Sequence, residues 1–150
     1  MAMVIQAANP HAQYLSHQAE IDQAIAAAIS GNRYILGPQT QAFESEFATY
    51  LNLAHGVGVG SGTEALHLAI RALDIGAGDE VITVSHTAVA TVSAIELAGA
   101  TPVLVDIDPH TYTLDPKAIE PALTPRTKAI IPVHLYGGAA DLDPIIDLAR

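Results

Sequence analysis

The sequence has no cysteine and few basic residues, and both shortages limit what the protein can be. Without cysteine there are no disulfide bonds, thiolate metal sites or cysteine nucleophiles. Six lysines and arginines stand against sixteen aspartates and glutamates, for a formal net charge of -10. Duplex nucleic acid is bound by clustered cations that displace its counterions, so this composition argues against a nucleic-acid partner.

Long hydrophobic runs are also missing. Gly, Pro, Asp or Glu interrupts each apolar stretch well short of a membrane span, and the first residues lack the cationic region of a secretory signal. We therefore expect a cytoplasmic protein with no membrane partner. Half of the 150 residues are apolar and 15% are charged, which is typical of one folded domain with a hydrophobic core.

The first third of the chain carries helical patterns. Residues 18–29 have an isoleucine at every fourth position, which predicts an amphipathic helix. Gly37 and Pro38 predict the start of a second helix. Three aromatic residues lie along one side of that helix: Phe43, Phe47 and Tyr50. We expect residues 1–50 to form a helical arm that precedes a sheet.

Strand and helix patterns alternate over residues 51–150. Strands are expected at residues 55–59, 81–84, 102–106 and 128–133, and helices at residues 64–73, 88–97, 116–123 and 142–150. Gly99 is placed to cap the end of one of these helices. The strand at 102–106 is apolar throughout, which favours burial on both faces. The alternation predicts an α/β fold with a mainly parallel, helix-flanked sheet.

A glycine-rich turn joins the first expected strand to its helix. Its glycines do not match the spacing of a dinucleotide-binding or Walker motif. They would still let the backbone approach a ligand, and the amides of Gly62, Thr63 and Glu64 would lie at a helix N-terminus, where a phosphate is favoured. The alternative is an ordinary tight turn with Thr63 as a helix cap, and the turn by itself does not decide between them.

Polar residues follow the strands at the edge where open α/β sheets bind ligands. His86 follows one strand and His134 another, although a lone histidine is more often a capped loop residue. Asp106 and Asp108 could chelate a divalent ion, but this pattern is at least as common in an Asx turn. Neither a zinc-protease motif nor a nucleophile elbow is present, and no metal site is predicted.

Several blocks, taken in order, resemble one family. They are YILGP at 34–38, GSGTEALH at 60–67, GDEVI at 78–82, TAVAT at 87–91, GATPVLVD at 99–106 and TPRTKAIIPVHLYG at 124–137. The chain from about residue 14 to 150 is similar to the DegT/StrS-type aminotransferases. These are fold-type I pyridoxal-phosphate enzymes that aminate keto groups of nucleotide-linked sugars. The resemblance implies that the chain is the incomplete large domain of such an enzyme.

The resemblance also implies roles for particular residues. The cofactor phosphate falls on Gly62, Thr63 and the amide of Glu64. Where the family commonly stacks an aromatic ring on the cofactor's pyridine ring, this chain has Ala88, and we hypothesise that His86 provides a flat surface instead. Tyr34 and Leu36 match the segment that reaches toward the partner subunit's active site. His134 matches a loop at the floor of the active-site cleft.

No catalytic residue is expected within the chain, because the family's Schiff-base lysine lies beyond Arg150. Lys117 and Lys128 are the only lysines, and both are expected at the surface. The whole enzyme would pass an amino group from a donor such as glutamate to a sugar ketone, as a homodimer serving polysaccharide biosynthesis. The 150 residues alone would be inactive. The alternatives are a dehydratase of the same family, in which histidine replaces the lysine, and a non-catalytic regulatory or truncated product.

Overall fold

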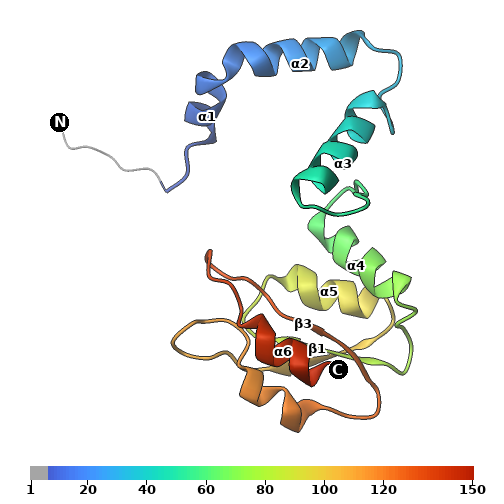
Figure 1. Ribbon diagram of the computed structural model, residues 1–150, viewed down its shortest axis with the longest axis vertical. Helices are drawn as coiled ribbons and strands as arrows, with labels where there is room; N and C mark the ends of the chain where they lie inside the picture. Colours follow the sequence, from blue (N-terminus) through green and yellow to red (C-terminus); the bar gives the residue numbers. More distant parts are fainter. Residues whose placement is uncertain (1–6) are drawn as a thin grey trace, which may run out of the picture. The chain divides into compact units, whose positions relative to one another are not determined.

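The computed structural model describes residues 7–150, which fall into two compact units that divide between Gly58 and Val59 (Figure 1). The first unit contains helices α1 (Pro10–Ser16), α2 (Gln18–Ser30) and α3 (Pro38–Tyr50). The second contains the sheet and the remaining helices.

The helices of the first unit begin where their capping residues place them. Asn9 caps α1, since its side chain accepts a hydrogen bond from the Ala12 amide at 3.1 Å, and Pro10 occupies the first helical position. The hydrophobic pattern did not predict this short helix. Helix α3 begins after Gly37, as expected, and stacks its aromatic side chains, with ring centroids of Phe43 and Phe47 5.5 Å apart.

Residues 55–59 do not form the strand that the sequence predicts. The Gly58 amide donates instead to the Glu44 carboxylate of α3, at 2.7 Å. A Cβ at Gly56 would lie only 2.6 Å from the backbone oxygen of Glu44, so this stretch is held against a helix rather than in a ladder. Two glycines in five residues also weaken the intrinsic strand preference.

The second unit is built on three parallel strands in the order β2-β1-β3 (Figure 1). They are β1 (Glu80–Val84), β2 (Thr101–Val105) and β3 (Thr127–Ile131). The central strand β1 is buried along its whole length. The Thr83 hydroxyl on this strand donates to the Ile131 carbonyl at 2.9 Å, so its burial leaves no unpaired hydroxyl. The expected parallel, helix-flanked α/β fold is confirmed.

Side chains alternate along β1 and build a core on each face of the sheet. On one face Val81 packs with Ile70 of α4 (Gly62–Ala72) and Ile95 of α5 (Val89–Leu97). On the other, Ile82 packs with Ile145 of α6 (Leu142–Leu148). The 3₁₀ turns η1 (Pro116–Ala118) and η2 (Glu120–Ala122) flank this second core.

Three expectations for the second unit are wrong in detail. Strand β2 is not buried on both faces, because it pairs only with β1 and leaves Leu104 53% exposed. The helix expected at 116–123 is a pair of 3₁₀ turns, since Pro121 has no amide to continue an α-helix. The helix expected at 64–73 ends at Ala72, and Leu73, which follows it, is exposed. Gly99 does cap α5, with a φ of 87°.

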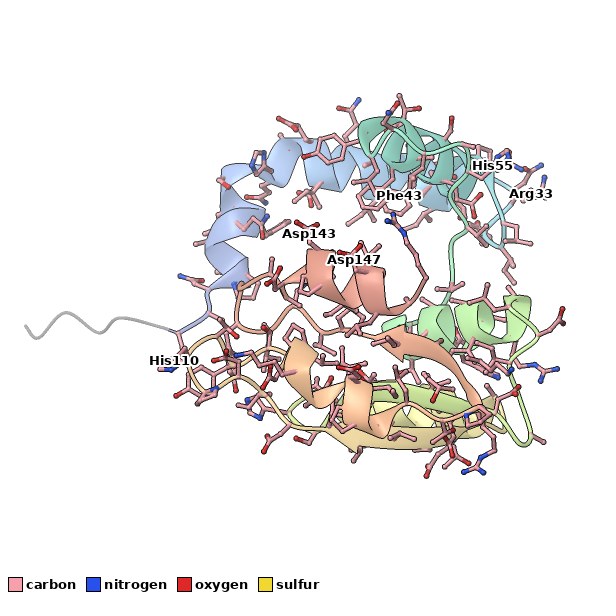
Figure 2. All side chains as sticks on the ribbon, turned by 60° about the horizontal axis from the view of Figure 1, so that its bottom comes forward. Arg33, Phe43, His55, His110, Asp143 and Asp147 are labelled. Atoms are coloured by element: carbon pink, nitrogen blue, oxygen red, sulfur yellow. The ribbon has the colours of Figure 1, made fainter. Side chains whose placement is uncertain are left out.

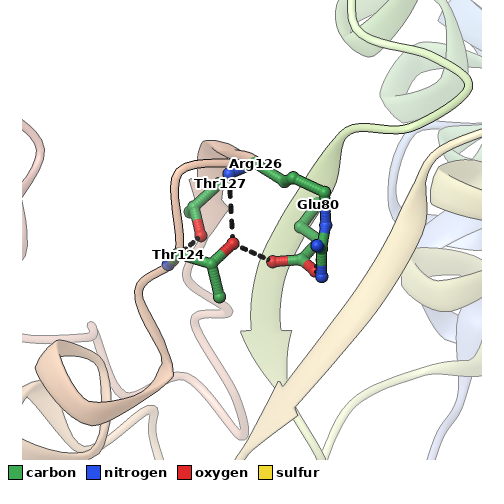
Figure 3. Close-up of polar contacts among 4 residues, drawn as sticks. All are labelled: Glu80, Thr124, Arg126 and Thr127. Atoms are coloured by element: carbon green, nitrogen blue, oxygen red, sulfur yellow. Dashed lines mark hydrogen bonds and ion pairs between the residues drawn. The ribbon is translucent and has the colours of Figure 1, made fainter.

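A polar cluster holds the amino ends of β1 and β3 together (Figure 3). The buried Glu80 carboxylate accepts hydrogen bonds from the Thr124 hydroxyl and from the Arg126 guanidinium, whose Nε lies 2.9 Å away. The Thr124 hydroxyl and then the Arg126 guanidinium hold the pKa of Glu80 below its ordinary value. Thr124 also accepts from the Arg126 amide at 3.1 Å and donates its own amide to Thr127. This cluster was not predicted from the sequence.

The strand register changes at the same point. Glu80 pairs with Thr127 while Val81 pairs with Ala129, so Lys128 is an extra residue in β3. Such a bulge redirects the alternation of the strand that follows it. Among residues 7–150, no helix has the length and apolar character needed to cross a lipid bilayer.

Candidate functional site

The glycine turn leads directly into α4, and its serine is the helix cap. Ser61 precedes the first helical residue, Gly62, and its hydroxyl accepts a hydrogen bond from the Glu64 amide at 3.2 Å. The cap predicted as one alternative is therefore present, but Ser61 provides it and Thr63 does not. Gly62 and Thr63 occupy the first two helical positions, where amides have no partner within the helix.

The carboxylate of Glu64 folds back over this turn. It accepts a hydrogen bond from the Gly60 amide at 2.8 Å, so serine and glutamate satisfy two amides reciprocally, in the manner of a capping box. A Cβ at Gly60 would lie 2.6 Å from that carboxylate oxygen, so a larger residue there would require the Glu64 side chain to move. At Gly62 a Cβ would meet no atom within 4 Å beyond its chain neighbours and the backbone of α4, so the space into which it would project is open.

His86 lies in the loop that follows β1. Its side chain is exposed, and its Nε2 lies 3.2 Å from the hydroxyl of Tyr136. The ring centroids of His86 and Tyr136 are 5.8 Å apart with planes inclined by 56°, and Tyr112 is a second ring neighbour at 6.5 Å. Tyr112 and Tyr136 were not singled out from the sequence, although both follow expected strands.

Ala88 is the residue before α5 and its side chain is exposed. It forms no capping hydrogen bond. At the start of the helix the hydroxyls of Thr87 and Thr91 instead form a hydrogen bond with each other, at 2.9 Å. A methyl group in an exposed loop therefore stands at the position where the resemblance implies an aromatic ring.

His134 stabilises its own loop. Its Nδ1 accepts a hydrogen bond from the Ala140 amide at 2.9 Å, which closes the segment between β3 and α6. An accepting Nδ1 requires the proton of the neutral ring to be on Nε2, the nitrogen left for another partner. His134 and Tyr136 belong to the same loop, so the structure brings the loops carrying His86 and His134 together. No hydrogen bond joins either histidine to the glycine turn in the described part of the chain.

Tyr34 and Leu36 lie in the first unit, between α2 and α3, in the segment where Figure 2 shows Arg33. Both side chains are exposed, and the Tyr34 hydroxyl donates to the Ile29 carbonyl at 2.8 Å. Leu36 has a φ of 49°, which is uncommon for a residue with a side chain. A Cβ at Gly37 would lie 2.5 Å from the Arg33 carbonyl oxygen, so a glycine is required there.

The two aspartates after β2 form turns. Asp108 accepts a hydrogen bond from the His110 amide at 2.7 Å, the pattern of an Asx turn, and Asp106 accepts from the Ile107 amide at 2.8 Å. Their oxygens therefore have local backbone partners, which favours the turn over the chelating alternative. Over residues 7–150, no three histidines or carboxylates gather as metal ligands.

The two lysines lie apart from these loops. Lys117 is exposed on η1, and Lys128 is exposed at the amino end of β3, opposite the edge that carries His86. Asp143 and Asp147 on α6, labelled in Figure 2, are also exposed. Neither lysine ammonium has a described contact with the loops that follow the strands.

Known proteins are similar to this chain in sequence and in fold. The chain is 51% identical over 138 residues to a dTDP-3-amino-3,4,6-trideoxy-alpha-D-glucose transaminase of Streptomyces venezuelae, covering 92% of this chain and 36% of that protein. The crystal structure of S. venezuelae DesV matches with a TM-score of 0.91 and 50% identity, covering 94% of this chain and 38% of that one. Bacillus subtilis NtdA, solved with bound cofactor PMP, matches with a TM-score of 0.86 and 36% identity, covering 89% and 31%.

These relatives are much longer than the chain, which spans less than two fifths of each. The similarity itself is nevertheless continuous from the helices of the first unit to the end of the sequence. The DegT/DnrJ/EryC1/StrS aminotransferase family matches residues 15–150. The chain belongs to this family of aminotransferases.

Proposed function

We propose that residues 1–150 are the first part of the large domain of a pyridoxal-phosphate-dependent aminotransferase that acts on a nucleotide-linked sugar. In this proposal residues 1–50 are its helical arm and residues 51–150 part of its sheet. Family membership and the transaminase relative support the activity. The observation that carries the proposal is the open helix start at Gly62, which the sequence had singled out as a phosphate anchor.

The turn fits a phosphate group. The amides of Gly62 and Thr63 lie at the start of the eleven-residue helix α4, where the helix dipole favours an anion. The space where a Cβ of residue 62 would project is empty. The Glu64 amide, which we also assign to the phosphate, is bonded to Ser61, so it would have to exchange that hydroxyl for the ligand.

The loops after the strands would surround the rest of the cofactor. We assign His86 to the face of the pyridine ring, since Ala88 offers a methyl group and no ring. We further assign Tyr34, Leu36 and His134 to the substrate or partner-subunit side of the cleft in a homodimer. The Nε2 proton of His134 would be available there, because Nδ1 is bonded to Ala140.

When bound, pyridoxal phosphate would supply the electron sink for transfer of an amino group from a donor such as glutamate to a sugar ketone. This chain would bind and orient that cofactor. Neither Lys117 nor Lys128 lies among the loops that would hold it, so we propose that the 150 residues alone do not catalyse transamination. We assign the whole enzyme to the cytoplasm and to polysaccharide biosynthesis.

Gly62→Ala tests the phosphate anchor. The new methyl group meets no protein atom, so the fold should be kept, but it enters the space assigned to the phosphate. We expect weaker binding of pyridoxal phosphate to the 150-residue chain, measured by the quenching of tyrosine fluorescence, with an unchanged thermal midpoint. Pyridoxal, which lacks the phosphate, is the matched control ligand and should bind both proteins equally. Equal pyridoxal-phosphate affinity in the two proteins would contradict the proposal.

A further inference from the structure

We propose that Tyr136 is a positioning residue that holds the ring of His86 in place at the carboxyl edge of the sheet. The proposal rests on the function proposed above, in which His86 faces the cofactor's pyridine ring. It assigns a task to a tyrosine that lies fifty residues away in the sequence, in the loop after β3.

The contact between the two side chains is both polar and aromatic. The Tyr136 hydroxyl lies 3.2 Å from His86 Nε2, and the ring centroids are 5.8 Å apart at an inclination of 56°. Tyr112 approaches the same imidazole from the loop after β2, with centroids 6.5 Å apart and planes inclined by 52°. His86 therefore has a tyrosine neighbour from each of the two loops that follow the flanking strands.

Both tyrosines have unusual backbone conformations. The φ of Tyr136 is 54° and that of Tyr112 is 59°, in the left-handed region that aromatic residues rarely adopt. Such conformations persist only where the surrounding structure imposes them, and they gather at functional sites. Two of the five non-glycine residues with positive φ in the described chain are thus the ring neighbours of His86.

The loops hold these conformations with their own hydrogen bonds. The Gly138 amide donates to the Leu135 carbonyl at 2.8 Å, which closes a tight turn around Tyr136. Around Tyr112 the Asp108 amide donates to the Thr113 carbonyl at 2.9 Å, and the Tyr112 amide donates to the Asp108 carbonyl at 2.8 Å. The backbone at each tyrosine is thereby held within a short, closed turn.

Burial does not explain the arrangement. Tyr136 is 81% exposed and Tyr112 is 52% exposed, so neither ring gains much by leaving water. The strained backbone at these tyrosines therefore does not stabilise the core. It orients the ring of His86, because an exposed histidine without partners would sample several rotamers.

Nuclear magnetic resonance of the 150-residue chain tests the contact without any cofactor. In Tyr136→Phe the ring stays and the hydroxyl is lost, so we expect the imidazole Nε2 resonance of His86 to move. Tyr112→Phe is the matched control, because the described contact of Tyr112 with His86 is made by its ring, and it should leave that resonance in place. Identical His86 resonances in the wild type and Tyr136→Phe would overturn the proposal.

A double-mutant cycle then connects the contact to the cofactor. Loss of one hydrogen bond corresponds to about a two- to twelvefold change in an equilibrium constant. We expect Tyr136→Phe to weaken pyridoxal-phosphate binding within that range, and to have no effect in a His86→Ala background. Equal losses in both backgrounds would overturn the proposal. If His86→Ala alone left the affinity unchanged, the role of His86 in the proposed function would be wrong, while the resonance measurement would still decide whether Tyr136 holds the ring.

Discussion

Replacing Glu64 by glutamine should strengthen phosphate binding at the glycine turn. In the structure the Glu64 carboxylate accepts a hydrogen bond from the Gly60 amide at 2.8 Å, and it therefore places a negative charge at the same helix start that we assign to the phosphate. The glutamine carbonyl can accept the same hydrogen bond, so the turn should keep its conformation. Only the charge is removed.

The size of the effect follows from two opposing contributions. Two unit charges about 4 Å apart repel by about 1 kcal/mol in water-like surroundings, which corresponds to about a fivefold gain in phosphate affinity when one is removed. A carboxylate in the first turn also stabilises a helix by about 0.3–1 kcal/mol through the dipole, and the variant loses that contribution. We therefore expect tighter phosphate binding by a slightly less stable protein.

Titration of the 150-residue chain with inorganic phosphate and with pyridoxal phosphate measures the first effect, and urea unfolding measures the second. The affinity gain should shrink as salt is added, because the repulsion between exposed charges is screened. Glu96→Gln, which removes an exposed carboxylate from α5, serves as the control and should leave phosphate affinity unchanged. If Glu64→Gln weakens phosphate binding, the carboxylate organises the turn for the ligand instead of competing with it, and the reasoning is refuted.

Three further predictions concern stability. Because the pKa of Glu80 is lowered in the folded protein, its carboxylate stabilises the fold at pH values above its ordinary pKa of 4.5, and that contribution is lost as the pH falls through the folded pKa. Thr124→Val removes the hydroxyl that lowers this pKa most, so the free energy of unfolding should fall less steeply in acid. An unchanged dependence on pH would contradict this. Ile95→Ala should cost about 2–5 kcal/mol in urea unfolding because Ile95 is fully buried between α4 and the sheet, while exposed Leu97→Ala should cost far less. Gly99→Ala should lower stability by about 1–2 kcal/mol, since the φ of 87° is unfavourable for alanine; a neutral result in thermal unfolding would show that the cap relaxes.

The sequence predicted the elements whose signals are local. Helix α3 begins where Gly37 and Pro38 indicate, and β1 matches the strand expected at residues 81–84. The failure at residues 55–59 has a non-local cause, because whether an apolar segment pairs as a strand depends on its neighbours, and here Gly58 bonds to Glu44 of α3. The exposure of Leu104 likewise depends on the position of β2 at the edge of the sheet, which composition does not reveal.

The candidate site was predictable to a similar extent. The glycine turn and His86 were identified because their residue types and their places after strands indicate ligand binding, and their roles remain predictions. Ser61 as the cap and Tyr136 as the neighbour of His86 were missed. The first depends on which of two hydroxyl residues, Ser61 or Thr63 on either side of Gly62, caps the helix. The second joins side chains fifty residues apart.

The bulge at Lys128 and the Glu80 cluster have a consequence for how this sheet can be altered. They align β3 with β1 at the amino ends of the strands, whereas His86 and Tyr136 lie in loops at the opposite ends. Strand alignment and the proposed ligand contacts thus depend on separate residues. The loops at the carboxyl ends could therefore be changed by protein engineering while the residues at the amino ends maintain the strand register. The same loops could also change in evolution without loss of that register.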